Sequence, residues 1–314
     1  MAKFSISNLL LFVLLLLLSC NKDSDQALYQ TDKRIRSIEI FKNEINILNK
    51  HFEYVDNKLI KITSNPPLNN PENIFPFKHE FEYSSENNVK GKYYIKYINE
   101  WILERSSIRN YEDERIKEYI NYIESNLETK LLDKITFEYN SGLPYNLKYY
   151  VNYGNELKLD RKELCQYSEG EIIETQIFYR DYGMDSMCIK NIFIRNEHLL
   201  NEILEYDRYY TGEWELNDKL SFTYSNNRIQ EVVSYKKNDT LMLPITKYSF
   251  DYDSEGLIKK MIINEMYSNI TYRFEYSYEK GEGNFNKLRI KYPYARWGYW
   301  IPNISLKYSY PPFL

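Results

Sequence analysis

The sequence predicts an all-β protein, a large antiparallel β-meander of repeated hairpins of about 28 residues each, curled or closed into a barrel-like sheet. Two observations carry this prediction. The first is composition: the 314 residues include 33 Tyr and 15 Phe but only 10 Gly, and aromatic residues favour strands. The second is an internal repeat, in which a strand, a short polar turn and a returning strand recur at a nearly constant spacing.

The clearest copy of the repeat lies at 250–263. Phe250 and Tyr252 stand two residues apart, so they share one face of a strand. Residues 253–256 then read Asp-Ser-Glu-Gly, which is typical of a turn, and the apolar stretch that begins at Leu257 supplies the returning strand. Each copy is therefore expected to form one β-hairpin.

The second aromatic residue of each copy marks the phase of the repeat, and we call it the marker. Successive markers lie 29, 28, 28, 28, 28, 29, 28, 24 and 32 residues apart. The copies at 111 and 195 are degenerate, and in the second of them an arginine replaces the tyrosine. The markers are Tyr54, Tyr83, Tyr111, Tyr139, Tyr167, Arg195, Tyr224, Tyr252, Tyr276 and Tyr308.

These copies of a two-strand unit predict about twenty strands with short connections, which make neighbouring strands antiparallel. An open twisted sheet of that size is out of range, so the sheet must curl, split into layers or close on itself. We therefore expect residues 34–314 to form a single repeat-built domain without an internal boundary.

One segment near the middle of the chain carries a competing signal. Ile116, Tyr119, Ile120 and Ile123 recur at helical spacing among charged residues, and the pattern continues to Leu131. The phase of the hairpin repeat passes through the same segment undisturbed. We therefore favour a strand for 112–131, and a helix stays open as the alternative.

The N-terminal residues have the proportions of a secretory signal. Lys3 precedes an entirely apolar run, Leu9–Leu18, which is too short to span a bilayer. The run closes on Ser19 and Cys20 before polarity changes abruptly. A cysteine directly after a small residue resembles the lipobox of bacterial lipoproteins.

Cleavage before Cys20 would divide the chain into a lipoprotein signal peptide, 1–19, a tether, 20–33, and the repeat domain. Acyl chains on Cys20 would hold the protein to a membrane, because each buried methylene contributes about 0.8 kcal/mol. The expected location is the outer membrane, lipid-anchored and facing the periplasm or the cell surface. An uncleaved anchor or a plain secreted protein are the alternatives.

The hairpin pattern resembles two known groups. The order Phe250, Tyr252, Gly256 is similar to a relaxed form of YD/RHS-type repeats, which build β-sheet shells, although most of their glycines and the regular Tyr-Asp pair are missing. Together with the lipobox at Cys20, the chain more closely resembles Bacteroides-type lipoproteins of an uncharacterised family with a porin-like β fold, over roughly Arg34 to Tyr310. That resemblance implies an envelope location and a curved many-stranded meander, and it implies no catalytic residues.

Charge and composition exclude several function classes. The 41 Lys+Arg against 45 Asp+Glu give a net charge of −4, so no nucleic-acid partner is expected. His51 and His79 fall at nearly equivalent places of adjacent copies, but no third His or Cys lies near them, so neither a metal nor another cofactor is expected. Cys165 and Cys188 are out of phase for a disulfide, whose Cα atoms lie within about 7 Å, and both are expected to be reduced.

A column of polar residues lies between the two aromatic residues of the copies. These side chains point away from the aromatic face, and equivalents in adjacent copies lie two strands, about 9.6 Å, apart. That distance is near the carboxylate separation of inverting glycosidases, but a solvated strand face shows the same alternation. The residues are Glu53, Glu82, Glu138, Thr223, Asp251 and Glu275.

An aromatic cluster near the C-terminus breaks the repeat. It holds two of the four tryptophans of the chain. Exposed rings there would stack on sugar faces or on aromatic and proline side chains of a peptide. The alternative is a plug that packs against one end of the core. The candidate ligand-binding residues are Tyr292, Tyr294, Trp297, Tyr299 and Trp300.

These features together predict a lipid-anchored cell-envelope lipoprotein that acts as a non-catalytic binding or interaction module, with a glycan or a peptide as its ligand. Two other function classes stay open. The carboxylate column would suit an envelope glycan-processing enzyme, and alternating strands are also found in outer-membrane pores. Closely spaced charges such as Lys259 and Lys260 would sit badly in a lipid-facing band.

Overall fold

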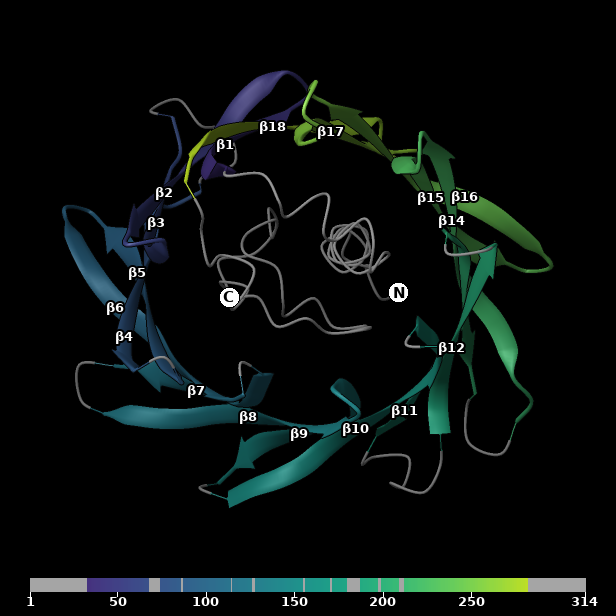
Figure 1. Ribbon diagram of the computed structural model, residues 1–314, viewed down its shortest axis with the longest axis horizontal. Helices are drawn as coiled ribbons and strands as arrows, with labels where there is room; N and C mark the ends of the chain where they lie inside the picture. Colours follow the sequence, from purple (N-terminus) through teal and green to yellow (C-terminus); the bar gives the residue numbers. More distant parts are fainter. Residues whose placement is uncertain are drawn as a thin grey trace. The chain divides into compact units, whose positions relative to one another are not determined.

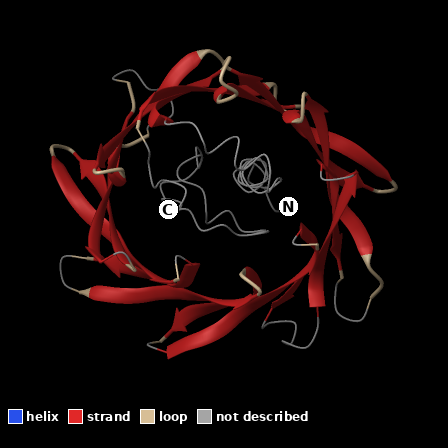
Figure 2. Ribbon diagram, in the orientation of Figure 1, coloured by secondary structure: helices blue, strands red, loops and turns tan. Residues whose placement is uncertain are grey.

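The computed structural model describes residues 33–281 with short gaps. All of the described elements are strands, as Figures 1 and 2 show. Within the described residues no helix is long and apolar enough to cross a membrane. The gaps are 68–73, 86, 114, 126–127, 155, 170, 180–186, 197–198 and 209–211.

Eighteen strands follow one another along the described part of the chain. Most are 8–13 residues long, which matches the strand length that the repeat predicts. The strands are β1 Lys33–Lys42, β2 Ile45–Val55, β3 Lys58–Asn65, β4 Phe77–Ser85, β5 Asn88–Tyr97, β6 Glu100–Glu112, β7 Arg115–Glu124, β8 Thr129–Asn140, β9 Leu143–Tyr153, β10 Glu156–Ser168, β11 Glu171–Tyr179, β12 Met187–Asn196, β13 Leu199–Asp207, β14 Glu215–Ser225, β15 Arg228–Asn238, β16 Leu241–Tyr252, β17 Ile258–Glu265 and β18 Ile270–Lys280.

The hydrogen-bonded order of the strands is a meander that closes. Each strand pairs with its neighbours in sequence, and β1 pairs antiparallel with both β2 and β18. This is the topology of a closed antiparallel β-barrel, and it leaves no unpaired edge. The predicted all-β meander of repeated hairpins is therefore confirmed.

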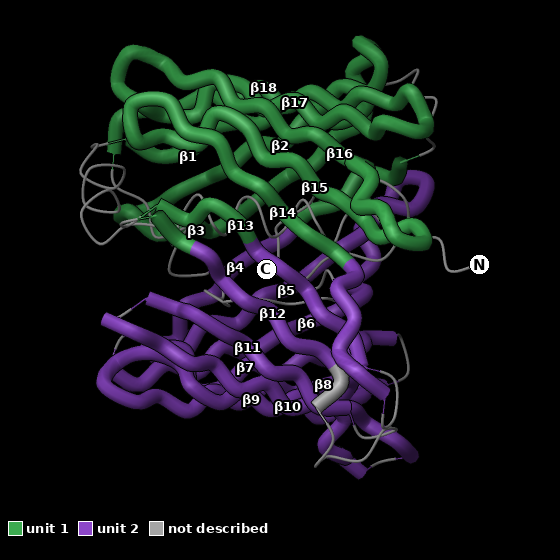
Figure 3. Tube along the Cα trace, turned by 90° about the vertical axis from the view of Figure 1, so that its right-hand side faces the viewer, with its two compact units in different colours: residues 1–78, 195–202, 218–314 green, residues 79–194, 203–217 purple. Residues whose placement is uncertain are grey.

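The chain divides into two compact units, which Figure 3 colours green and purple. Unit 1 comprises Met1–Lys78, Arg195–Glu202 and Asp218–Leu314. Unit 2 comprises His79–Ile194 and Ile203–Asn217. Strands β1–β3 and β15–β18 belong wholly to unit 1, and β5–β11 belong wholly to unit 2.

Several hairpins turn through two residues with left-handed backbone. Asp56 and Asn57 have φ of 47° and 61°, and Asn226 and Asn227 have φ of 52° and 59°. Two positive φ values in a row characterise the turn that matches the twist of the flanking strands, and Asn, Asp and Gly tolerate it best. The polar turn residues of the repeat are therefore what allow the chain to reverse so tightly.

A β-bulge accompanies most of the markers. Beside Tyr54, the partner of Glu53 is Lys61 whereas the partner of Tyr54 is Leu59, so the returning strand carries one extra residue. Such an extra residue interrupts the ladder and increases the local twist. The same shift recurs beside Tyr111, Tyr139, Tyr167, Tyr224 and Tyr252.

The hydroxyl group of the marker bonds to the preceding hairpin. Tyr252 donates to the backbone carbonyl of Ile229, which is the residue opposite the previous marker, Tyr224. The bulge disturbs the ladder at this carbonyl, and the hydroxyl supplies a donor. The bonds are Tyr139 to Ile116 at 2.7 Å, Tyr167 to Pro144 at 2.7 Å, Tyr224 to Leu200 at 2.8 Å, Tyr252 to Ile229 at 2.7 Å and Tyr278 to Ile258 at 2.9 Å.

The final described copy corrects one marker. The sequence assigned Tyr276, but Tyr278 makes the bond to the preceding hairpin, at the carbonyl opposite Tyr252. Strand β18 pairs with β17 without a bulge. Phe274, Tyr276 and Tyr278 therefore lie on the same face of β18, and Tyr278 is the one nearest to the preceding hairpin turn. The last assigned marker, Tyr308, lies outside the described residues.

The first aromatic residue of each copy forms the core. Phe52, Phe137 and Phe250 are buried, and the branched residues of the returning strands, such as Ile62 and Ile263, are buried with them. The segment at 112–131 belongs to this pattern, because β7 and β8 pair there and Ile135 faces Tyr119 across the ladder. The strand prediction is confirmed, and within this described segment the helical alternative is wrong.

Candidate functional site

The aromatic cluster and the lipidation site that the sequence predicted lie outside the described residues. Cys20 precedes the described part of the chain, and Tyr292, Tyr294, Trp297, Tyr299 and Trp300 follow it. Both therefore remain predictions. The chemistry that the structure does place concerns the carboxylate column, the histidines, one cysteine and a set of buried polar residues.

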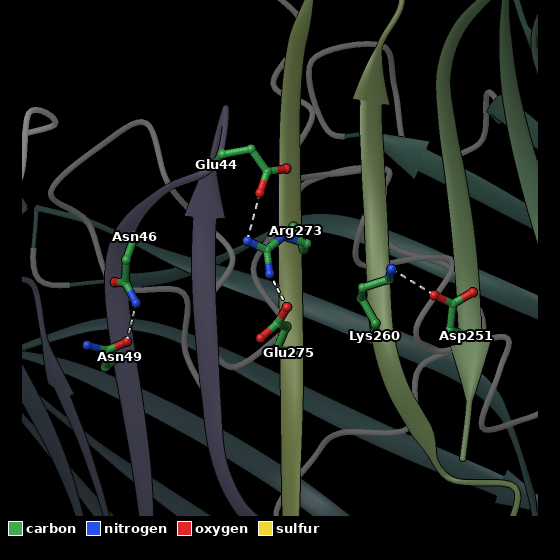
Figure 4. Close-up of polar contacts among 7 residues, drawn as sticks. All are labelled: Glu44, Asn46, Asn49, Asp251, Lys260, Arg273 and Glu275. Carbon is green, nitrogen blue, oxygen red and sulfur yellow. Dashed lines mark hydrogen bonds and ion pairs between the residues drawn. The ribbon is translucent and has the colours of Figure 1, made fainter. Parts of the chain in front are cut away.

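The carboxylates of the column are exposed or half-buried, and each lies beside a cation on a neighbouring strand or, for Glu275, on its own strand. Asp251, whose side chain is 59% exposed, lies 3.0 Å from the Nζ of Lys260, and Glu275 pairs with Arg273, which also binds Glu44 at 2.8 Å. Figure 4 shows Asp251 on β16 facing Lys260 on β17, and Arg273 with Glu275 on β18, reached by Glu44 from the turn between β1 and β2. A cross-strand pair such as Asp251 and Lys260 stabilises a solvated strand face by about 0.2–1 kcal/mol.

Glu138 has the largest set of partners in the column. Lys148 donates to it, and so do Asn146 at 2.8 Å and Tyr145 at 3.0 Å. The hydrogen bond from Lys148 is the main reason why the pKa of Glu138 lies below its ordinary value. A general acid needs the opposite shift, so Glu138 is held as a permanent anion.

The two histidines that the sequence placed together face opposite sides of the sheet. His51 is exposed and lies beside the buried Phe52, whereas His79 is buried and lies two residues before the buried Phe81. Strand alternation therefore separates them, because they differ by one residue in the phase of the repeat. No group of three metal-ligating side chains is found among the described residues.

Cys165 is a free, buried thiol, as predicted. It occupies the place of the first aromatic residue in its copy, opposite Thr175 on β11. Burial, and secondarily the carboxylate of Glu163, raise the pKa of this thiol well above its ordinary value. Cys165 is therefore expected to be unreactive at neutral pH.

A row of buried polar residues was not predicted from the sequence. Four residues before each of the first eight markers, the side chain faces the core, and five of these eight positions are polar or charged. The repeat could have identified these buried polar residues, because the position four residues before the marker is apolar in other copies, such as Ile135 and Leu220. The row is Lys50, His79, Ser107, Ile135, Glu163, Asn191, Leu220 and Tyr248, all of them buried.

In unit 2 this row meets a buried arginine. Arg109 stands where other copies have the first phenylalanine, and none of its surface is exposed. Its guanidinium lies over the ring of Tyr119, 5.0 Å from the centroid, and over that of Phe81 at 5.7 Å. Its Nη1 donates to the Oγ of Ser107 at 3.2 Å.

Gly91 allows these polar groups to approach one another. A Cβ on Gly91 would lie 2.8 Å from the Nε2 of His79, 2.8 Å from the Oγ of Ser107 and 3.2 Å from the Nη1 of Arg109. A side chain at this position would therefore collide with all three residues. We call His79, Gly91, Ser107 and Arg109 the Arg109 cluster.

Electrostatics keeps the histidine of the Arg109 cluster neutral. Burial, and secondarily the charge of Arg109, lower the pKa of His79 well below its ordinary value. The ring of His79 also stacks on Phe81, with centroids 4.5 Å apart. The Arg109 cluster therefore carries one positive charge, on Arg109, at neutral pH.

Comparison with solved structures shows similarity to porin-like proteins of Bacteroides. The chain is 10% identical to a porin-like protein from Bacteroides uniformis, with a TM-score of 0.40, covering 78% of this chain and 96% of that one. A porin-like protein from Bacteroides vulgatus is 9% identical, with a TM-score of 0.38 and coverage of 78% and 98%.

A second similarity is to the TcdB2-TccC3-Cdc42 structure, in which the matching region is 6% identical, with a TM-score of 0.28, covering 74% of this chain and 15% of that one. No protein-family model and no curated protein matches the chain.

Proposed function

We propose that the protein is a lipid-anchored lipoprotein of the cell envelope that presents its β-meander as a non-catalytic module binding a glycan or a peptide. The observation that carries the proposal is the leader, in which the apolar run Leu9–Leu18 closes on Ser19 and Cys20. The described carboxylate column supports the non-catalytic part, because Glu138, Asp251 and Glu275 each lie beside a cation.

Replacing Cys20 by Ala is expected to abolish lipid attachment, because acylation needs this sulfur atom. The experiment follows the incorporation of an alkyne-tagged fatty acid into the protein in a bacterium that processes lipoproteins. The wild-type protein should be labelled and recovered with the membranes, and Cys20→Ala should be neither. Cys165→Ala, which removes the buried thiol in β10, is the matched control and should be labelled like the wild type. Labelling that persists in Cys20→Ala would contradict the proposal.

Replacing both Trp297 and Trp300 by Ala is expected to weaken ligand binding at least tenfold, since interface tryptophans contribute about 2 kcal/mol or more each. The measurement is binding to a glycan array and to a peptide array. The control is Trp101→Ala, because Trp101 is a partly exposed tryptophan on a described strand, β6. Equal binding by the wild type and the double variant would contradict the assignment of the binding surface.

A further inference from the structure

Among the described residues, no opposite charge lies beside the buried cation Arg109. None of its surface is exposed, and within this described part of the chain its Nε and Nη2 atoms have no hydrogen-bond partner. Among the described residues, the ion pairs include no carboxylate bound to Arg109. A buried charge left without compensation strongly disfavours folding. A negative charge beside Arg109 would therefore stabilise the fold.

The aromatic neighbours compensate only part of this charge. Phe81 and Tyr119 offer their rings to the guanidinium, and such contacts are favourable in a desolvated site. Ring faces do not accept hydrogen bonds in the way that an anion does, so the Nε and Nη2 donors stay unsatisfied. Since His79 is neutral, the charge to be balanced is a single one.

The polar groups of the Arg109 cluster crowd one edge of the guanidinium against Gly91. His79 Nε2, Ser107 Oγ and Arg109 Nη1 all lie within 3.2 Å of the place that a Cβ of Gly91 would occupy. On this edge Nη1 is satisfied, because it donates to Ser107 Oγ. The donors left over, Nε and Nη2, belong to the other edge of the guanidinium, and a pair of N–H donors on one charged fork is suited to an anion.

We propose that Arg109 binds a small monovalent inorganic anion of the chloride class, through its Nε and Nη2, on the buried face of unit 2. One negative charge balances the one positive charge of the Arg109 cluster. A monatomic ion suits a site that is closed to solvent, because it occupies a smaller volume than a polyatomic anion of the same charge. The unsatisfied Nε and Nη2 of Arg109 are the donors that the anion would take up.

The test compares the thermal stability of the full-length protein in sodium chloride and in sodium gluconate at equal ionic strength. Gluconate is too large for the site. A ligand that binds only the folded state raises Tm, so we expect Tm to rise by a few degrees and to saturate as chloride replaces gluconate. In crystals grown with sodium bromide, an anomalous peak is expected beside Arg109.

Two variants of Arg109 decide the assignment. Arg109→Phe restores the aromatic residue of the other copies, and Arg109→Met keeps a flexible apolar chain. Both should lose the chloride-dependent rise in Tm. Arg228→Met is the matched control, because Arg228 is exposed and lies over the ring of Tyr252 at 5.7 Å, and it should keep the rise. No chloride-specific rise in the wild type, or the same rise in the Arg109 variants, would overturn the proposal, and so would a bromide peak found only elsewhere.

Discussion

The Asp133→Asn variant is expected to be more stable than the wild type at about pH 7, by about 2–3 kcal/mol, and equally stable near pH 3.5. Burial raises the pKa of Asp133 to about 6, and this outweighs the opposite effects of the hydrogen bond from Asn121 and the charge of Arg105. Between about pH 4 and pH 6 the folded protein therefore holds the proton that the unfolded chain has lost, and stability falls as pH rises. Asn carries no charge and escapes this penalty.

The measurement is urea unfolding of both proteins between about pH 3.5 and pH 8. Glu138→Gln is a control of opposite sign in the same unit, because the pKa of Glu138 is lowered by Lys148. Glu138 therefore stabilises the fold above the ordinary pKa of a carboxyl, and its replacement should cost up to about 1 kcal/mol at neutral pH and nothing in acid. A constant difference between Asp133→Asn and the wild type across this range would show that ionisation of Asp133 is not the cause.

Replacing Phe274 by Ala is expected to lower the free energy of unfolding by about 3–5 kcal/mol. Phe274 lies in β18 with an exposed fraction of 0%, opposite Met261 on β17 and Ile40 on β1. The substitution removes a whole ring from the pairing that joins the last described strand to the first. The loss contains both the transfer of the ring from water and the cavity that remains.

Tyr267→Ala provides the comparison, because Tyr267 belongs to the same unit and is 68% exposed in the turn between β17 and β18. Its free energy of unfolding should change by less than about 0.5 kcal/mol. Urea unfolding followed by circular dichroism measures both variants. Similar small losses for the two would contradict the assignment of Phe274 to the core.

The hairpin architecture was predictable from sequence because its signal is strictly periodic. Phe250 and Tyr252 reappear at one spacing. The same spacing favoured a strand around Ile116, and the structure places β7 there, between β6 and β8 in the strand order. Local helical spacing was outweighed by pairing with neighbouring strands, which single-segment patterns do not report. The bulges were not predicted, because a one-residue insertion in the returning strand leaves the period unchanged. At the last described copy the opposite holds: β18 pairs with β17 without a bulge, and Tyr278 rather than Tyr276 bonds to the preceding hairpin.

The buried polar residues were harder to find. A lone Lys50 or Arg109 in a sequence reads as a solvated residue, because charged side chains are almost never fully buried. Only the phase of the repeat, four and two residues before the marker, shows that these side chains share the face of Phe52 and Phe81. His51 and His79 illustrate the precision that is required. A difference of one residue in phase puts them on opposite faces, although their positions in adjacent copies look almost equivalent.

The tyrosine hydroxyl that bonds to the preceding hairpin has a consequence for how such chains change in length. Four of the five described bonds of this kind join a copy to its immediate predecessor at the carbonyl opposite the earlier tyrosine, and the fifth, from Tyr224 to Leu200, follows the copy in which Arg195 replaces that tyrosine. Duplication or deletion of one complete copy in frame would preserve the donor and the acceptor at each junction. Proteins built from this hairpin can thus gain or lose strands two at a time, as modular arrays do, while each remaining pair of neighbouring copies keeps its tyrosine–carbonyl bond.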